Sequence, residues 1–234
     1  FTLVEISIGL VIIGLVIGGI VTGKSMIEAA ELRGLLSQLD KIDTALNSFK
    51  TKYNCLPGDC LVATNFFPSG GCPNGDGVAT TTCNGDGSAY INHPASGTTT
   101  QRREALKFWQ HLALAGLVDG QYTGIGGSGD TDKHAMIGTN VPKTPIAGLS
   151  ISVWHHFTQF SVWASYHGID NVGMSYHWFY IGAETSNDGV YNGKLTVGQS
   201  MSIDRKVDDG IANNGNFRVG PSNATYLTTG CTQG

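Results

Sequence analysis

Residues 74–77 and 84–87 have the residue types of a calcium loop, because both segments read Asn-Gly-Asp-Gly. Side-chain oxygens of Asn and Asp, spaced by glycines, can wrap around Ca²⁺, a hard cation that prefers oxygen ligands. The match is partial, since Cys72 and Thr82 stand at the first loop positions and no glutamate stands at the twelfth. A pair of glycine turns, in which Asn and Asp tolerate positive φ, explains the same residues. The candidate ligands are Asn74, Asp76, Asn84 and Asp86. No pattern in the sequence requires a cofactor, and Ca²⁺ in these loops is the one candidate.

The cysteines predict disulfides rather than a metal or redox centre. No two of them have Cys-x-x-Cys spacing, which zinc and redox motifs use. In an oxidising compartment disulfides are the default state. A Cys55–Cys60 bridge would close a tight loop around a Leu-Pro-Gly-Asp turn, and a Cys72–Cys83 bridge would staple the glycine-rich loop. Cys231 would then be free or would replace a partner in one of these pairs, because connectivity does not follow from sequence.

Histidines and carboxylates give little support to catalysis. His155 and His156 are adjacent, so on a strand they would point to opposite faces and could not easily share a metal ion. The sequence contains no G-x-S-x-G, H-E-x-x-H or P-loop pattern. Asp208 and Asp209 could ligate a cation, but a solvated helix end explains them more simply. We therefore expect a protein that is not an enzyme and has no catalytic residues.

Glu5 has the most unusual surroundings of any carboxylate in the chain. It is the only charged side chain in residues 1–23, which are long and apolar enough to span a bilayer core of about 30 Å as a helix. At the bilayer centre an acidic side chain costs about 2.5–3.5 kcal/mol, so it needs a function and a cationic partner. The nearest cation is the α-amine of Phe1, which suits Glu5 of a neighbouring copy better than Glu5 of its own helix. Such a pair would set the axial stagger of a helical assembly.

Residues 1–5, Phe-Thr-Leu-Val-Glu, match at every position the processed N-terminus F-T-L-I/V-E of type IV pilins and type II secretion pseudopilins. At these residues the chain resembles that superfamily. The Leu-Pro-Gly-Asp turn at 56–59 and the segments 109–120 and 203–210 are similar to those of its larger members. The resemblance implies that a prepilin peptidase cuts just before Phe1 and N-methylates it. An ordinary N-terminal membrane anchor with a stray glutamate is the alternative.

Glycines interrupt the apolar segment and indicate where it could bend or pack closely. Each costs about 1 kcal/mol of helix propensity relative to alanine. Their Gly-x-x-x-Gly spacing allows helices to approach closely in a membrane, and the resemblance implies local unwinding on assembly. The four positions are Gly14, Gly18, Gly19 and Gly23.

We predict an α+β fold in which a long N-terminal helix, about residues 1–53, packs its C-terminal half on an antiparallel β-sheet head, the pilin lollipop shape. Residues 1–25 would form the hydrophobic membrane and filament-core helix, residues 26–54 an amphipathic helix packed on the head, and residues 55–234 an extracellular head with glycine-rich loops. In the head we expect a helix over 101–118, strands over 149–157, 159–167 and 174–183, and a short helix over 196–208 with Thr196 as its N-cap.

The resemblance implies a structural subunit that polymerises into an extracellular type IV pilus-like filament. Its partners would be other copies of itself in a helical homopolymer, together with prepilin peptidase, an assembly ATPase and an inner-membrane platform. The unassembled subunit would sit in the inner membrane, and the assembled one on the cell surface. The alternatives are a type II secretion pseudopilin and a minor or tip pilin that acts as an adhesin. A net charge of -4 without a basic block gives no indication of nucleic-acid binding.

Overall fold

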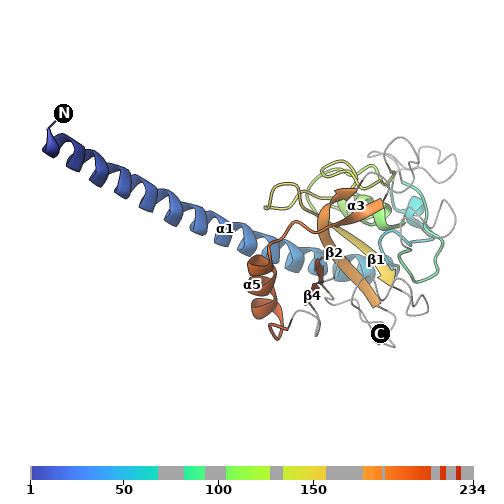
Figure 1. The fold of residues 1–234 in the computed structure, drawn as a ribbon. Helices are drawn as coiled ribbons and strands as arrows, with labels where there is room; N and C mark the ends of the chain where they lie inside the picture. Colours follow the sequence, from blue (N-terminus) through green and yellow to red (C-terminus); the bar gives the residue numbers. More distant parts are fainter. Residues whose placement is uncertain are drawn as a thin grey trace.

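The structure, a computed structural model, combines one long helix with a compact α+β head (Figure 1). It describes residues 2–67, 82–92, 104–126, 134–156, 176–185, 188–211, 217–219 and 225–227. The long helix, α1 (Leu3–Tyr53), has 51 residues, and its first half projects away from the head (Figure 1). The α+β class and the long N-terminal helix confirm the prediction.

The remaining elements of the described ranges are short, and the strands among them form one antiparallel sheet. They are η1 (Ala63–Asn65), α3 (Glu104–Leu114), β1 (Ser150–His156), β2 (Tyr176–Thr185), β3 (Asp188–Asn192), α5 (Val197–Val207), β4 (Phe217–Val219) and β5 (Thr225–Leu227). The sheet order is β1-β2-β5-β4, and β3 pairs with the C-terminal end of β2.

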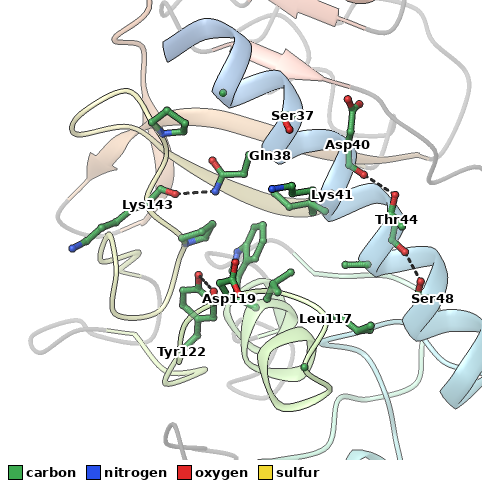
Figure 2. A pocket seen from close by; sticks show the side chains of 18 residues that line it. Ser37, Gln38, Asp40, Lys41, Thr44, Ser48, Leu117, Asp119, Tyr122 and Lys143 are labelled. Carbon is green, nitrogen blue, oxygen red and sulfur yellow. Dashed lines mark hydrogen bonds between the residues drawn. The ribbon is translucent and has the colours of Figure 1, made fainter. Parts of the chain in front are cut away.

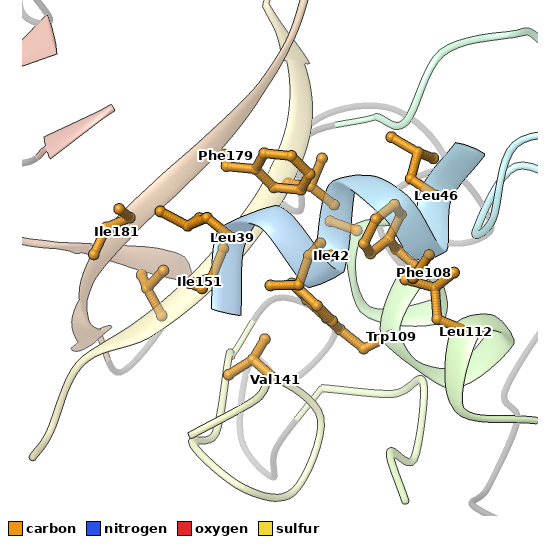
Figure 3. Packing of buried hydrophobic residues seen from close by; sticks show 14 of the residues in the cluster. Leu39, Ile42, Leu46, Phe108, Trp109, Leu112, Val141, Ile151, Phe179 and Ile181 are labelled. Atoms are coloured by element: carbon orange, nitrogen blue, oxygen red, sulfur yellow. The ribbon is translucent and has the colours of Figure 1, made fainter. Parts of the chain in front are cut away.

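The second half of α1 is amphipathic, as the sequence predicts, and it supplies the centre of the head core. Its buried side chains recur every three or four residues, so they lie on one face of the helix. They are Leu32, Leu35, Leu39, Ile42, Ala45, Leu46 and Phe49. Figure 3 shows Ile42 and Leu46 among side chains of α3, and Leu39 beside those of the sheet.

The β1–β2 pairing gives the sheet one face on this core. Ile151 pairs with Ile181, and Val153 pairs with Phe179; all four side chains are buried in the core cluster. The alternation of strands places the intervening residues on the opposite face.

Most predicted elements of the head are present, and the differences lie at their ends. β1, β2 and α5 fall within the predicted ranges to within two residues, and Thr196 is the N-cap of α5. The predicted strand over 159–167 lies outside the described residues. The helix predicted to reach residue 118 ends instead at Leu114, because Gly116 adopts a positive φ of 69° that breaks the helical path.

Candidate functional site

The first half of α1, residues 3–27, is an exposed apolar surface that we call the free helix. Its large apolar side chains are all more than half exposed, from Val16 at 54% to Leu3 at 87%. By length and composition this part of α1 could cross a membrane. An N-terminal hydrophobic helix of this kind is typical of membrane and secreted proteins.

The glycines of the free helix leave open space around it. A Cβ added at any of the four predicted positions would meet nothing within 4 Å in the described structure. The helix runs unbroken through all of them in this single chain. Close packing or local unwinding at Gly14, Gly18, Gly19 and Gly23 therefore stays a prediction.

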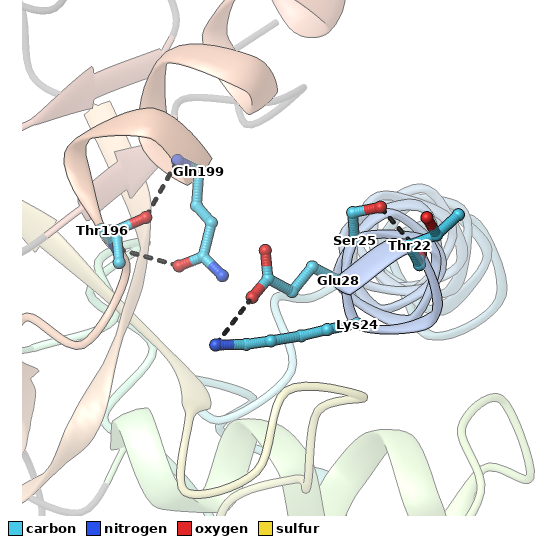
Figure 4. Close-up of polar contacts among 6 residues, drawn as sticks. All are labelled: Thr22, Lys24, Ser25, Glu28, Thr196 and Gln199. Atoms are coloured by element: carbon cyan, nitrogen blue, oxygen red, sulfur yellow. Dashed lines mark hydrogen bonds and ion pairs between the residues drawn. The ribbon is translucent and has the colours of Figure 1, made fainter. Parts of the chain in front are cut away.

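A polar boundary separates the free helix from the half that packs on the head (Figure 4). Lys24 and Glu28 form an ion pair at 3.9 Å, one helical turn apart. Close to them, Thr22 Oγ1 donates to the Gly18 carbonyl and Ser25 Oγ donates to the Thr22 carbonyl, so these hydroxyls are satisfied within the helix. Charged side chains thus begin in the last turn of the free helix.

Glu5 has partners inside its own helix. The Thr2 amide donates to Glu5 Oε2 at 2.7 Å, and the Glu5 amide donates to Thr2 Oγ1 at 3.3 Å. This reciprocal capping box satisfies N–H groups that have no helical partner. The sequence carries the signal for this box as Thr-x-x-Glu at residues 2–5, although it is not among the features predicted above. Phe1 lies outside the described residues, so its predicted pairing with Glu5 of another copy stays a prediction.

In the head, the Leu-Pro-Gly-Asp turn and the second Asn-Gly-Asp-Gly segment pack directly on each other. The Gly85 amide donates to the Cys60 carbonyl at 2.9 Å, and the Gly87 amide donates to the Asp59 carbonyl at 3.0 Å. A Cβ at Gly85 would lie 2.3 Å from the Asp59 carbonyl carbon, so only glycine allows this approach. Two motifs that the sequence treats separately therefore form one structural unit.

Disulfides hold this unit. Cys55 and Cys60 are bonded, which confirms the predicted pair. Cys83 is also disulfide-bonded. Its predicted partner, Cys72, and the remaining cysteine, Cys231, lie outside the described residues.

Three acidic side chains converge beside this turn, and we call them the head carboxylate cluster: Asp59, Asp86 and Glu104. One oxygen of each lies within 4.8 Å of the others. Burial raises the pKa of Asp59 to about 7 and that of Glu104 to about 8. The cluster therefore retains protons at neutral pH in the absence of a cation.

Backbone amides support the two buried members of the cluster. Asp59 accepts from the Ser88 amide at 3.0 Å and the Ala89 amide at 2.8 Å. Glu104 accepts from the Asp86 amide at 3.1 Å, and from both the amide and the side chain of Asn92. The cluster thus fastens the loop 82–92 to the turn and to α3.

The predicted calcium ligands have different surroundings. Asp86 belongs to the head carboxylate cluster, whereas Asn84 Oδ1 already accepts from the amide and the hydroxyl of Thr64. Asn74 and Asp76 lie outside the described residues. The sequence analysis missed Asp59 and Glu104, because they come from a turn and a helix that only the fold brings together. Calcium in these loops stays a prediction.

Buried histidines act as hydrogen-bond acceptors in the same region. The Gly58 amide donates to His111 Nδ1 at 2.9 Å, and the Ile91 amide donates to His177 Nε2 at 3.0 Å. Burial lowers the pKa of each imidazole to about 3, so both are neutral at physiological pH. They fasten the turn and the loop 82–92 to α3 and to the sheet.

An open groove of about 850 Å³ runs along the polar face of α1 (Figure 2). Its walls are α1 and the loops that follow α3 and precede β1. Gln38 Nε2 crosses the groove and donates to the Lys143 carbonyl at 2.8 Å, while Tyr122 Oη donates to the Asp119 carbonyl at 3.0 Å. The Gln38–Lys143 hydrogen bond therefore joins α1 to the loop that precedes β1, whereas the Tyr122–Asp119 bond lies within a single wall.

No protein-family model, curated protein or solved structure matched this chain.

Proposed function

We propose that this chain is the structural subunit of an extracellular type IV pilus-like filament, assembled through the free helix. The observation that carries the proposal is that residues 3–27 expose apolar side chains on every side. Apolar surface gains about 25 cal/mol per Å² on leaving water, so a helix of this kind requires a covering. A bilayer would cover it before assembly, and the helices of neighbouring copies would cover it in the filament.

The shape of the molecule is consistent with a free helix that assembles and a head that stays outside the filament core. The free helix projects away from the head, so helices of many copies can bundle while the heads remain outside (Figure 1). The second half of α1 supplies core residues of the head. In this proposal it stays packed in the head when the first half leaves the membrane. In this proposal a prepilin peptidase, an assembly ATPase and an inner-membrane platform act on the chain as separate proteins.

The low content of charged residues, and their placement along α1, are consistent with an apolar helix that is covered in the filament. Charged residues make up 14% of the composition, below the quarter that is typical of globular proteins. Apart from Glu5, the free helix has charge only at its boundary, at Lys24 and Glu28. Polymerisation requires no cofactor in this proposal.

The test is to examine fibres sheared from the surface of producing cells, by negative-stain electron microscopy and by mass spectrometry of their subunits. A strain that lacks the chain is the control. We expect this chain to be the dominant subunit and the fibres to be absent from the control strain. Fibres that contain the chain only as a trace would contradict the proposal and would identify a tip or secretion subunit. Recovery of the chain only in membranes would indicate a simple anchor.

A further inference from the structure

A second group of carboxylates lies where α5 ends, far along the chain from the head carboxylate cluster. One oxygen of each of Asp204, Asp208 and Asp209 lies within 4.8 Å of the others. The last turn of α5 also carries Arg205 and Lys206, cations that the partial negative charge at the C-terminal end of a helix favours. No ion pair between either of them and the three aspartates is found among the described residues.

Asp204 is the member whose position most needs explaining. Its side chain is buried, with 1% exposure, and neither carboxylate oxygen accepts a hydrogen bond within the part of the chain that the structure describes. The Gly210 amide is close enough to favour the ionised form but does not reach hydrogen-bonding geometry. A buried carboxylate without a partner is strongly unfavourable, which points to a ligand that the protein chain does not itself provide.

The other two members are held in place by the backbone. Asp208 Oδ2 accepts from the Phe217 amide at 3.1 Å, and Asp209 Oδ1 accepts from the Ile211 amide at 2.8 Å. Gly210 has a φ of 78°, which turns the chain sharply after the two aspartates. A carboxylate has about four lone-pair sites, so one that accepts from an amide can also bind a cation.

We propose that Asp204, Asp208 and Asp209 bind one hard divalent cation, and that this cation is Ca²⁺. All three side chains offer oxygen, the ligand that Ca²⁺ prefers. Two ligands that each lie about 2.4 Å from one ion can be at most about 4.8 Å apart, and these oxygens satisfy that limit. Carbonyl groups and water would complete the coordination shell.

The bound ion would fix α5 in its place on the head. α5 packs against both α1 and β4, and Asp208 already joins the end of α5 to the first residue of β4. By reducing the repulsion among the three carboxylates, the ion would stabilise the contacts of α5 with α1. The inference does not depend on the proposed filament.

The test is calorimetric titration of CaCl₂ into the full chain, purified in detergent and stripped with EGTA. We expect one Ca²⁺ per chain for the wild type, and at least a tenfold loss of affinity in Asp204→Asn. Asp209→Asn, which changes an exposed residue, should keep the fold and also weaken binding. Asp40→Asn, which changes an exposed carboxylate of α1 that belongs to neither carboxylate group, is the matched control and should retain the site.

Thermal unfolding distinguishes a lost ligand from a lost fold. In EGTA, Asp204→Asn should unfold at a higher temperature than the wild type, because the variant removes an unpaired buried charge. Added CaCl₂ should raise the unfolding temperature of the wild type but not that of Asp204→Asn. Absence of binding to the wild type at millimolar CaCl₂ would overturn the proposal. So would binding that is unchanged in both α5 variants or lost in Asp40→Asn. MgCl₂ that binds as tightly would overturn the choice of Ca²⁺.

Discussion

The Thr2 amide donates to Glu5 Oε2 at 2.7 Å, and the Glu5 amide donates back to Thr2 Oγ1 at 3.3 Å. Glu5 therefore has a local function as part of a capping box, independent of any other copy of the chain. A carboxylate has about four lone-pair sites, so capping leaves room for a cation from a neighbour. Capping and axial register are separable, because capping needs an acceptor whereas pairing with an amine needs a negative charge.

Substitution of Glu5 by glutamine or leucine separates these two functions. Glutamine at this position can still complete a capping box, but it is uncharged. If Glu5 pairs with an amine of another copy, both Glu5→Gln and Glu5→Leu should remain in the membrane fraction and fail to form filaments. Thr2→Ala, which removes the cap at a cost of about 1 kcal/mol, should still assemble. Normal filaments from Glu5→Gln, seen by electron microscopy, would show that capping alone explains the residue.

The helices could be predicted because their signals are local. The buried residues of α1 repeat every three or four positions, and Thr196 with Gln199 forms the capping box that starts α5. The head carboxylate cluster could not be predicted in this way. Asp59, Asp86 and Glu104 come from a turn, a loop and a helix, and no periodicity relates positions that only tertiary packing brings together.

The burial of Asp204, whose carboxylate accepts no hydrogen bond among the described residues, could not be predicted from the sequence either. From the sequence alone, Asp208 and Asp209 are explained most simply as a solvated helix end. Their neighbour Asp204 is one helical turn earlier, and its burial follows from the packing of α5 on α1 and β4. Burial of a polar residue is a property of the fold, so the sequence pattern alone gave no reason to single it out.

Alanine at Gly18 or Gly19 should affect the filament and not the single chain. A Cβ at either position meets open space in the described structure, and alanine favours a helix by about 1 kcal/mol per site. Circular dichroism of the full chain in detergent should show equal or higher helicity. Fibre yield should fall if neighbouring helices approach closely at these glycines. An unchanged yield would indicate that they pack elsewhere, and Gly198→Ala in α5 is the control for a glycine outside the free helix.

The pH dependence of head stability follows from four buried groups. The pKa values of His111 and His177 are lowered to about 3, so the stability they provide is full above pH 6.5 and is lost as the pH falls toward 3. The pKa values of Asp59 and Glu104 are raised to about 7 and 8, so their contribution is present in acid and is lost as the pH rises to those values. Each group contributes a slope of about 1.4 kcal/mol per pH unit while it titrates.

These opposing slopes predict a plateau of stability at about pH 4.5–6.5 and a decline from there to pH 8. Chemical denaturation of the full chain in detergent, with EGTA present, measures the profile. Glu104→Gln should flatten the alkaline decline, because glutamine does not ionise. A wild-type stability that rises between pH 6.5 and 8 would contradict the assignment of raised pKa values to the carboxylates.

Gly85→Ala tests whether the two head motifs depend on each other. The added Cβ would lie 2.3 Å from the carbonyl carbon of Asp59, a backbone atom that cannot move without disturbing the turn closed by Cys55 and Cys60. Overpacking of this kind costs about 1–3 kcal/mol, and separation of the motifs would also leave Asp59 without its amide donors. We expect a lower unfolding temperature for the full chain in detergent. Gly198→Ala, whose Cβ meets open space in α5, should be neutral or stabilising, and equal effects of the two variants would contradict this close approach.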